Sequence, residues 1–496
     1  MCGQRNKSAA GDQKLHWLRD NIYLYRGYFS NSCVFLFSTC VLIVDTQVSP
    51  IAGQRLKNEI RKITDLPIKY VINTHHHGDH IGGNAVFKEA TIIGSELTQK
   101  LAIEKDHDRV EYAKAFGLNF QEWHPPFPPT TTFNGTHTLM IDDEMVVISH
   151  LGKSETEDAC VVFFPKRLAV AVGDSVSTHD YPFMGTPFLD EGLRDDGEWI
   201  GALRRIQNLN ATLLLPGHGH PLQGSEIEKR LTLLIALYSD LLNTTRPLVE
   251  QRLPVPEIVA RVNEQLADYR RHPGLQEKTL CQRFAIYRCI NSIDPERKGK
   301  GWWQDLRPSV VKKAPISEME EIFKEISTED ELQKTCEIFI KNKEVYKAIS
   351  LLELYASKHQ SSQAYAFLSD ILFDQFTTVK PAVDATEFIV EAKKAYENSL
   401  AINPQNPLAL LSKSIIDIFG GMILAQDMSQ PIAMLEQLEK THHFSKNQKK
   451  KLLFFLGKAH QLSGDFSKSD FYYKKILPPV VRMIFPVIVN KFRRYP

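Results

Sequence analysis

The chain has 496 residues, of which 43% are hydrophobic and 24% are charged, and its formal net charge is +1 at pH 7. This length exceeds what one hydrophobic core normally holds, so we expect at least two domains. The composition is that of a soluble globular protein, and the near-neutral charge gives no electrostatic reason to expect a nucleic-acid partner.

Cysteine usage and apolar runs bear on the compartment. The seven cysteines are scattered and form no Cys-x-x-Cys pair. An odd number of cysteines, most of them in apolar segments, favours reduced thiols. The N-terminus is polar and is not followed by the apolar segment of a secretory signal, and no apolar run reaches the ~18 residues of a spanning helix. The sequence therefore predicts a cytoplasmic protein without a transmembrane segment.

The N-terminal region predicts a series of strands. Residues 22–25, 33–37 and 40–44 are apolar and are separated by glycine, serine and asparagine. The last strand ends at Asp45, which either caps the surface or supports a metal ligand from behind; we favour the second interpretation. Residues 52–63 then have helical spacing and lead into a further strand over 68–72.

A histidine cluster, THHHGDH at residues 74–80, follows that strand. Side chains alternate in an extended segment, so His75 and His77 point the same way and the histidine between them points the opposite way. Asp79 and His80 come one turn later, where a helix can begin, and the two glycines that follow permit close backbone approach. Three imidazoles and one carboxylate are a ligand set for zinc or another first-row metal.

The spacing His-x-His-x-Asp-His, with its surroundings at 74–83, resembles the metallo-β-lactamase fold superfamily. The resemblance covers residues 15–225 and implies an α/β fold, an αββα sandwich, with two metal ions between its loops. The same resemblance implies that Asp79 orients the attacking nucleophile as well as ligating a metal.

A departure from the family pattern occurs before the strand predicted at 160–164. In the superfamily a Gly-His-Thr loop supplies a histidine ligand there, but alignment on Thr156 places Glu155 at that position. Alkyl sulfatases of the superfamily carry a glutamate at the same place, as a resemblance. His150, at the end of the preceding strand, is the alternative ligand, and we favour Glu155.

Two later motifs complete the ligand set that the resemblance implies. Asp174 follows a glycine after the strand predicted at 168–172, like the carboxylate that bridges two metals, although the alkyl sulfatases use glutamate there. His218 lies in a Pro-Gly-His-Gly loop after the strand predicted at 211–215. The resemblance assigns His75, His77 and Glu155 to one metal, and Asp79, His80 and His218 to the other, with Asp174 between them. The aromatic residues of 179–188 either shape an apolar substrate site or pack its rim.

The C-terminal half is predicted to be helical. Residues 231–242, 255–266 and 275–289 have helical spacing and finish a catalytic domain assigned to 1–300, with a linker beginning near 293. Segments 391–407 and 453–466 resemble tetratricopeptide repeats, with insertions at 377–384 and 420–431, so residues 316–496 are assigned to an all-α tetratricopeptide-like domain. This domain either binds a protein partner or a second copy of the chain, or only stabilises the enzyme.

The resulting hypothesis is a metal-dependent hydrolase. A bound metal lowers the pKa of its water to about 7, so hydroxide held by two metals would attack an ester, thioester, lactam or sulfate ester as the small-molecule substrate. The metals are two divalent ions, with zinc first and iron or manganese as alternatives. Two other classes stay open: an iron-dependent oxidoreductase of the persulfide dioxygenase type, and an interaction protein with a vestigial metal site.

Overall fold

The structure is a computed structural model, and it describes residues 13–27, 30–105, 127–178, 182, 197–272, 275, 279–294, 296, 311–378, 386–424 and 427–476. These residues fall into two compact units. The first holds the described residues up to 296, and the second holds those from 311 onward. The domain limits assigned from the sequence, 1–300 and 316–496, stay a prediction.

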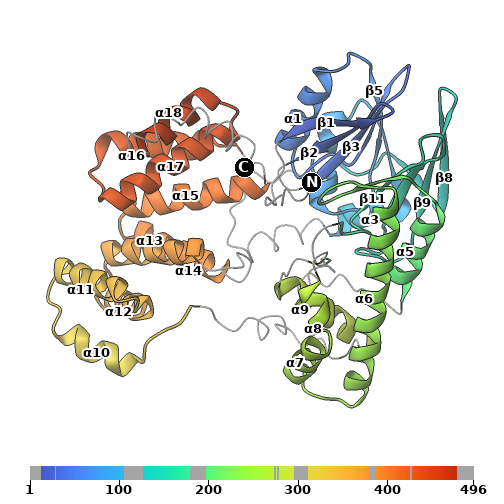
Figure 1. The fold of residues 1–496 in the computed structure, drawn as a ribbon. Helices are drawn as coiled ribbons and strands as arrows, with labels where there is room; N and C mark the ends of the chain where they lie inside the picture. Colours follow the sequence, from blue (N-terminus) through green and yellow to red (C-terminus); the bar gives the residue numbers. More distant parts are fainter. Residues whose placement is uncertain are drawn as a thin grey trace, which may run out of the picture. The chain divides into compact units, whose positions relative to one another are not determined.

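The described strands of the first unit form two sheets (Figure 1). The first sheet has its strands in chain order: β1 (Lys14–Arg19), β2 (Ile22–Arg26), β3 (Asn31–Leu36), β4 (Val41–Val44), β5 (Ile68–Ile72), β6 (Thr91–Ser95) and β7 (Thr131–Phe133). The second has the order β13 (Leu222–Gln223), β12 (Leu213–Pro216), β11 (Ala169–Gly173), β10 (Cys160–Phe164), β9 (Glu144–His150) and β8 (Thr136–Ile141). Strands β4 to β7 run parallel, as do β11 and β12, and the other pairs are antiparallel.

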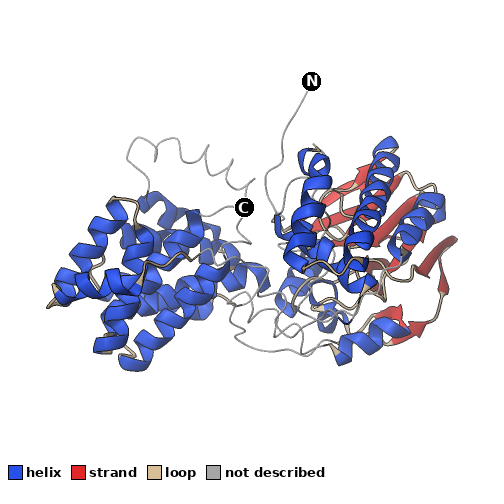
Figure 2. Cartoon of the chain, turned by 90° about the horizontal axis from the view of Figure 1, so that it is seen from below, coloured by secondary structure: helices blue, strands red, loops and turns tan. Residues whose placement is uncertain are grey.

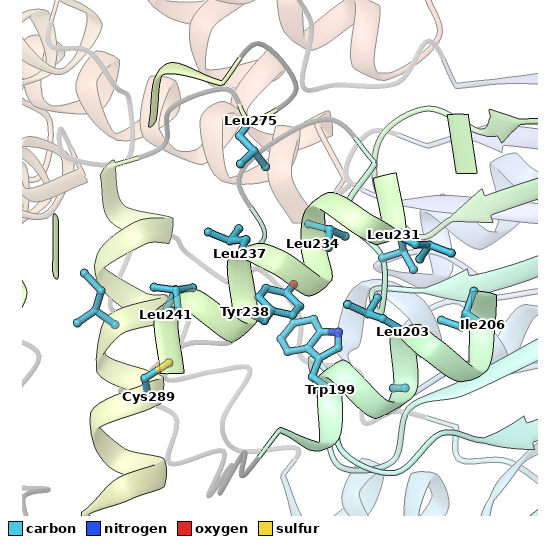
Figure 3. Packing of buried hydrophobic residues seen from close by; sticks show 14 of the residues in the cluster. Trp199, Leu203, Ile206, Leu231, Leu234, Leu237, Tyr238, Leu241, Leu275 and Cys289 are labelled. Carbon is cyan, nitrogen blue, oxygen red and sulfur yellow. The ribbon is translucent and has the colours of Figure 1, made fainter. Parts of the chain in front are cut away.

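Three apolar clusters show how the layers stack. One lies between the sheets, where the rings of Phe35 and Phe164 stack with centroids 3.7 Å apart. A second joins the first sheet to α1 (Pro50–Arg61) through Leu56 and Ile60. The third lies between the second sheet and its helices (Figure 3). The αββα arrangement predicted from the sequence is therefore confirmed.

Of the helices predicted in the first unit, α1 and the helix over Val255–Gln265 lie within two residues of the predicted bounds, whereas the helix predicted at 231–242 extends over Ser225–Glu250. The Ser49 side chain accepts a hydrogen bond from the backbone N–H of Ala52, and Pro50 occupies the first turn, so α1 starts two residues before the predicted 52. The other helical elements are α2 (Gly78–Ile81), η1 (Asn84–Phe87), α3 (Glu96–Glu104), η2 (Pro165–Arg167), α5 (Glu198–Asn208), α6 (Ser225–Glu250), α7 (Val255–Gln265), α8 (Ala267–Arg271) and α9 (Thr279–Ile293).

Three strands escaped sequence analysis: β1, β7 and β13. Each lies at an edge of its sheet, where one side of the strand has no partner to bury it. Trp17 of β1, for example, is 64% exposed. Short edge strands carry little apolar periodicity, which is the signal on which a strand prediction depends.

The described part of the second unit is all helical (Figure 2). Its helices are α10 (Ile316–Lys324), α11 (Glu329–Lys341), α12 (Val345–His359), α13 (Ser362–Thr378), α14 (Thr386–Ile402), α15 (Pro407–Leu424), α16 (Ser429–Thr441), α17 (Lys446–Leu462) and α18 (Phe466–Ile476). From α11 to α18, each helix packs against the next along the chain. The all-α class is confirmed, whereas the likeness to tetratricopeptide repeats stays a prediction.

The insertion predicted at 420–431 stays a prediction, and its described residues belong mostly to helices. Helix α15 continues through Gly420 and Gly421, and α16 begins at Ser429. The two glycines are buried. The insertion predicted at 377–384 lies mostly outside the described residues. No helix in the described part of the chain has the length and apolar character that a membrane crossing requires.

Candidate metal centre

The candidate site lies at the carboxyl ends of parallel strands. Strands β4 and β5 pair in parallel and lead directly to Asp45 and to the histidine cluster. Strands β11 and β12 also pair in parallel, and they lead to Asp174 and His218. The backbone N–H of Asn31 donates to the carbonyl of Gly217 at 2.7 Å, which links the first sheet to the last of these loops. All four loops therefore meet at one edge of the sandwich.

Small residues leave room for this convergence. A Cβ atom on Gly83 would lie 2.0 Å from the carbonyl oxygen of Thr46, so only glycine fits beside that strand end. A Cβ atom on Gly217 would lie 2.2 Å from Oδ1 of Asp174. The close approach expected for the glycines after residue 81 is confirmed, and a further glycine admits the Asp174 carboxylate.

The first group of potential ligands consists of His75, His77, Glu155 and Asp174. Their donor atoms all lie within 4.8 Å of one another. Oε2 of Glu155 is 3.3 Å from Nδ1 of His77 and 3.8 Å from Nε2 of His75. His75 and Glu155 are each only 2% exposed.

The second group consists of Asp79, His80 and His218. Oδ2 of Asp79 lies 3.2 Å from Nε2 of His80 and 3.0 Å from Nε2 of His218. The Asp174 carboxylate also reaches this group, because its Oδ1 is 3.4 Å from Nε2 of His80 and its Oδ2 is 3.2 Å from Nε2 of His218. Asp174 therefore faces both groups.

These spacings fit ligation of a metal. Two donors that each lie about 2.1 Å from a tetrahedral ion are separated by about 3.4 Å. The separations around Glu155 and Asp174 scatter about this value, and several exceed a good hydrogen bond. Among the described residues, the buried Nε2 of His75 has no hydrogen-bond partner. A cation would satisfy that nitrogen, so the residues present fit divalent metal ions.

A buried carboxylate fixes which nitrogen of two histidines faces the site. Asp45 accepts from Thr74 Oγ1 at 2.7 Å and lies 2.8 Å from Nδ1 of His80, so Nδ1 of His80 donates to it. The Thr74 hydroxyl uses its only hydrogen in the bond that it donates to Asp45, so it can only accept from Nδ1 of His75, at 3.0 Å. Both histidines consequently turn Nε2 towards the site, where the neutral ring would offer its lone pair to a metal. The contact predicted for Asp45 behind a candidate ligand is present, and the Asp45 backbone has a left-handed φ of 63°.

Ionisation within the groups follows from burial and charge. Burial, with the neighbouring His80 and His77, lowers the pKa of His75 well below its ordinary value, so this imidazole is neutral at pH 7. Burial alone would raise the pKa of Asp79 and lower that of His218. The opposite charges outweigh it: the pKa of Asp79 is well below its ordinary value, and Asp174 raises the pKa of His218 to about 10. Without a cation, the carboxylates therefore hold protons on the facing imidazoles.

His76 has a role that sequence reasoning missed. It points away from the ligand groups, as predicted, but it is buried, and its Nδ1 lies 2.9 Å from Oδ1 of Asp158. Burial would raise the pKa of Asp158, but the charge and hydrogen bond of His76 hold it below its usual range. This pair joins the loop that carries His75 and His77 to the loop that carries Glu155.

His150, the alternative ligand, does not join either group. It ends β9, where it pairs with Cys160 of β10, and its Nε2 lies 2.9 Å from the carbonyl oxygen of Glu157. The register that brings Glu155 into the site is thus the one found in the structure. The aromatic residues of 179–188 all lie outside the described residues, and the structure describes Pro182 alone of that segment.

Comparisons with known proteins agree with this geometry. Residues 26–218 match the metallo-beta-lactamase superfamily. A linear primary-alkylsulfatase from Pseudomonas sp. (strain ATCC 19151) is 26% identical over 220 residues, which are 38% of this chain and 40% of the relative. A metallo-beta-lactamase type 2 from Elizabethkingia meningoseptica is 25% identical over 236 residues, which are 45% of this chain and 84% of the relative.

One solved structure extends the likeness beyond the matched region. The stereoselective inverting sec-alkylsulfatase Pisa1 from Pseudomonas sp. has a TM-score of 0.51 at 14% identity, over 77% of this chain and 65% of that chain. At this identity the likeness concerns the fold alone. The chain thus contains a metallo-β-lactamase domain with alkylsulfatase homologues, followed by a helical unit, and the alignment spans less than half of the alkylsulfatase relative.

Proposed function

We propose that the protein is a metal-dependent hydrolase with two divalent cations. His75, His77 and Glu155 would hold one ion, and Asp79, His80 and His218 would hold the other, with Asp174 between them. The observation that carries this proposal is the position of the Asp174 carboxylate, whose oxygens lie 3.4 Å from His80 and 3.2 Å from His218 while it also belongs to the first group. One carboxylate that serves two donor groups is the arrangement a paired-metal site needs.

The chain's own residues prepare the site for hydrolysis. When bound, the cations supply Lewis acidity and lower the pKa of a water molecule to about 7. Asp45 holds protons on Nδ1 of His80 and, through Thr74, on Nδ1 of His75, which keeps both Nε2 atoms available as donors. Oδ2 of Asp79, which is acceptor-only when ionised, can orient the attacking water by accepting its hydrogen bond.

Zinc is the first metal to expect, because imidazole and carboxylate donors both suit it. The specific observation that favours a second candidate is the composition of the first group. Two imidazoles and one carboxylate, from His75, His77 and Glu155, are also the donor set of non-haem iron(II) enzymes. An iron-dependent oxidoreductase is therefore the second candidate function.

The substrate class proposed first is a sulfate ester. The finding that supports it is the sequence likeness to a linear primary-alkylsulfatase. The resemblance drawn from the sequence points the same way, because it implies that the alkyl sulfatases carry a glutamate at the position of Glu155. A lactam is the next class to test, because a metallo-beta-lactamase is comparably similar over the same domain. A protein partner or a second copy on the helical unit, and a cytoplasmic location, stay predictions.

The test combines metal analysis with a substrate panel. Protein purified without added metal is analysed by inductively coupled plasma mass spectrometry, then assayed on an alkyl sulfate, a carboxylic ester, a thioester and a lactam. Two equivalents of zinc or manganese with turnover of one of these substrates would support the hydrolase. Near-stoichiometric iron with oxygen consumption on a persulfide would support the oxidoreductase instead. A protein that neither contains nor takes up metal would support the vestigial site.

A further inference from the structure

We infer that Arg288 of α9, together with Trp199 of α5, positions the loop that presents Glu155 to the metal. Helix α9 lies outside residues 26–218, the part of the chain that matches the metallo-beta-lactamase superfamily. The inference rests on the proposed function, because it assigns Arg288 a task at that same site. It makes a helix beyond the matched region necessary for the first metal ion.

The contacts of Arg288 are directed at one short segment. Its side chain is buried, and its Nη1 donates to the carbonyl oxygen of Glu155 at 3.1 Å, while Nη2 donates to the carbonyl oxygen of Ser154. The planar guanidinium therefore binds two successive carbonyls of the ligand-bearing loop. The Cζ atom of Arg288 also lies 4.7 Å from the centroid of the Trp199 ring, so the indole fixes the plane of the guanidinium group.

The same residues hold the turn that carries Asp174. The indole N–H of Trp199 donates to the carbonyl oxygen of Ser175 at 2.9 Å, and the hydroxyls of Ser175 and Ser154 lie 2.9 Å apart. Trp199 is itself fixed, because it is 1% exposed and its ring lies 4.8 Å from that of Tyr238 on α6 (Figure 3). One network thus ties the Glu155 loop and the Asp174 turn to the helices that cover the second sheet.

The loop needs such external support. Residues 151–159 connect β9 to β10 without regular structure, so backbone hydrogen bonds of a sheet or helix do not determine where Glu155 points. Lysine could not replace arginine here, because an ammonium group is a point donor that cannot bind two carbonyls in a fixed plane or stack on an indole. Arg288 also brings a buried positive charge to the loop that carries the unusual carboxylate.

Arg288→Lys tests the inference, with Arg167→Lys as a matched control. Arg167 is also buried, donates to the carbonyls of Asp20 and Leu36, and lies 4.5 Å from the Phe37 ring centroid. It differs in that it also pairs with the Glu144 carboxylate, and its hydrogen bonds among the described residues include none to a ligand loop. Each full-length variant is stripped with a chelator and titrated with cobalt(II), with d–d absorption and metal content as readouts. Thermal unfolding of the metal-free proteins measures the loss of stability common to both variants.

We expect Arg288→Lys to weaken one of the two cobalt sites at least tenfold and to change its absorption, as the loss of a supporting partner typically does. Arg167→Lys should bind both ions within about threefold of wild type. Trp199→Phe, which keeps an aromatic face but loses the N–H, should also weaken cobalt binding and serves if Arg288→Lys does not fold. Wild type with fewer than two sites would overturn the proposed function. If wild type binds two cobalt ions and Arg288→Lys binds them with unchanged affinities, this inference alone is overturned. If only Trp199→Phe folds, unchanged affinities in that variant have the same consequence.

Discussion

Replacement of Glu155 tests both the ligand set and its charge. Glu155→Ala should reduce the bound metal preferentially by one equivalent, because the first group would keep only two imidazoles and the shared Asp174. Glu155→His restores the donor typical of the superfamily and should keep both ions. His150→Ala is the control, because Nε2 of His150 lies 2.9 Å from the carbonyl oxygen of Glu157 and it belongs to neither donor group.

Glu155→His also removes one negative charge from the site. A unit charge at about 4 Å contributes about 1 kcal/mol in bulk water and about 4 kcal/mol at an effective dielectric constant of about 20. These energies correspond to about 1 to 3 pH units in the ionisation that limits activity on the acid side. Since Glu155 is only 2% exposed, the shift should not fall at the bulk-water limit. A negative charge near the water disfavours its deprotonation, so its removal should move the rising limb of activity towards acid.

Metal content by mass spectrometry and kcat/KM between pH 5 and 10 measure these effects, using the best substrate from the panel. The expected result is two ions and an acid-shifted limb in Glu155→His, about one ion in Glu155→Ala, and wild-type behaviour in His150→Ala. A His150→Ala variant that empties the site would refute the assignment. A rising limb that stays in place in a fully loaded Glu155→His variant would refute the electrostatic reasoning.

Four further predictions concern other parts of the chain. His77→Ala should weaken metal binding by more than the about 10–100-fold typical of a supporting partner and abolish turnover, while circular dichroism shows the helical unit still folded; wild-type turnover would misplace the site. Deletion of 320–496 should leave metal bound but change the oligomeric state or solubility seen by light scattering, and a fully active, unchanged monomer would make the helical unit an independent module. Metal binding at pH 7 should release about two protons, because ligation needs neutral imidazoles. The metal-free site raises the pKa of His218 to about 10 and that of His80 well above its ordinary value, so both rings are protonated before the metal binds. Calorimetry in buffers of different ionisation enthalpy measures this release, and a binding enthalpy that does not depend on the buffer would contradict it. Asp158→Asn should cost about 1–3 kcal/mol of unfolding free energy at pH 7. Because the pKa of Asp158 is lower in the folded protein than in the unfolded chain, its stabilisation is present above the unfolded pKa of about 3.9 and fades below that pH. An equal cost at pH 7 and pH 3 in denaturant titrations would contradict the pairing with His76.

The sequence was sufficient to predict many of the strands and the histidine cluster for a local reason, whereas the sandwich and the other candidate ligands came from the family resemblance. Buried strands of parallel pairs such as β4 and β11 are short apolar runs, and each is followed by an aspartate that its neighbours in sequence make conspicuous. His75 and His77 could be placed on one side from the alternation of an extended chain alone. Even the departure at Glu155 was visible, because Thr156 and the strand that follows fixed the register.

The supporting residues had no such local signal. Asp158 is 82 positions from His76, and Arg288 is 133 positions from Glu155, so neither pair forms a spacing motif. His76 could be recognised as facing away from the ligands, but its partner depended on how the Glu155 loop folds. Arg288 lies on an amphipathic helix where an arginine is normally a solvated residue, and only the packing of α9 buries it.

Glu155, which the sequence analysis singled out, and Arg288, which it did not mention, belong to one physical problem. A glutamate in place of histidine adds a negative charge to a site that already contains Asp79 and Asp174, and it occupies an irregular loop. A charge that is both buried and poorly fixed is costly, so its position must be determined by groups outside the loop. Arg288 meets that requirement from a helix beyond the matched region, with one guanidinium bound to two carbonyls of the loop. The departure from the family pattern and the additional helix are therefore best understood together, and substitution at either position should act on the same metal ion.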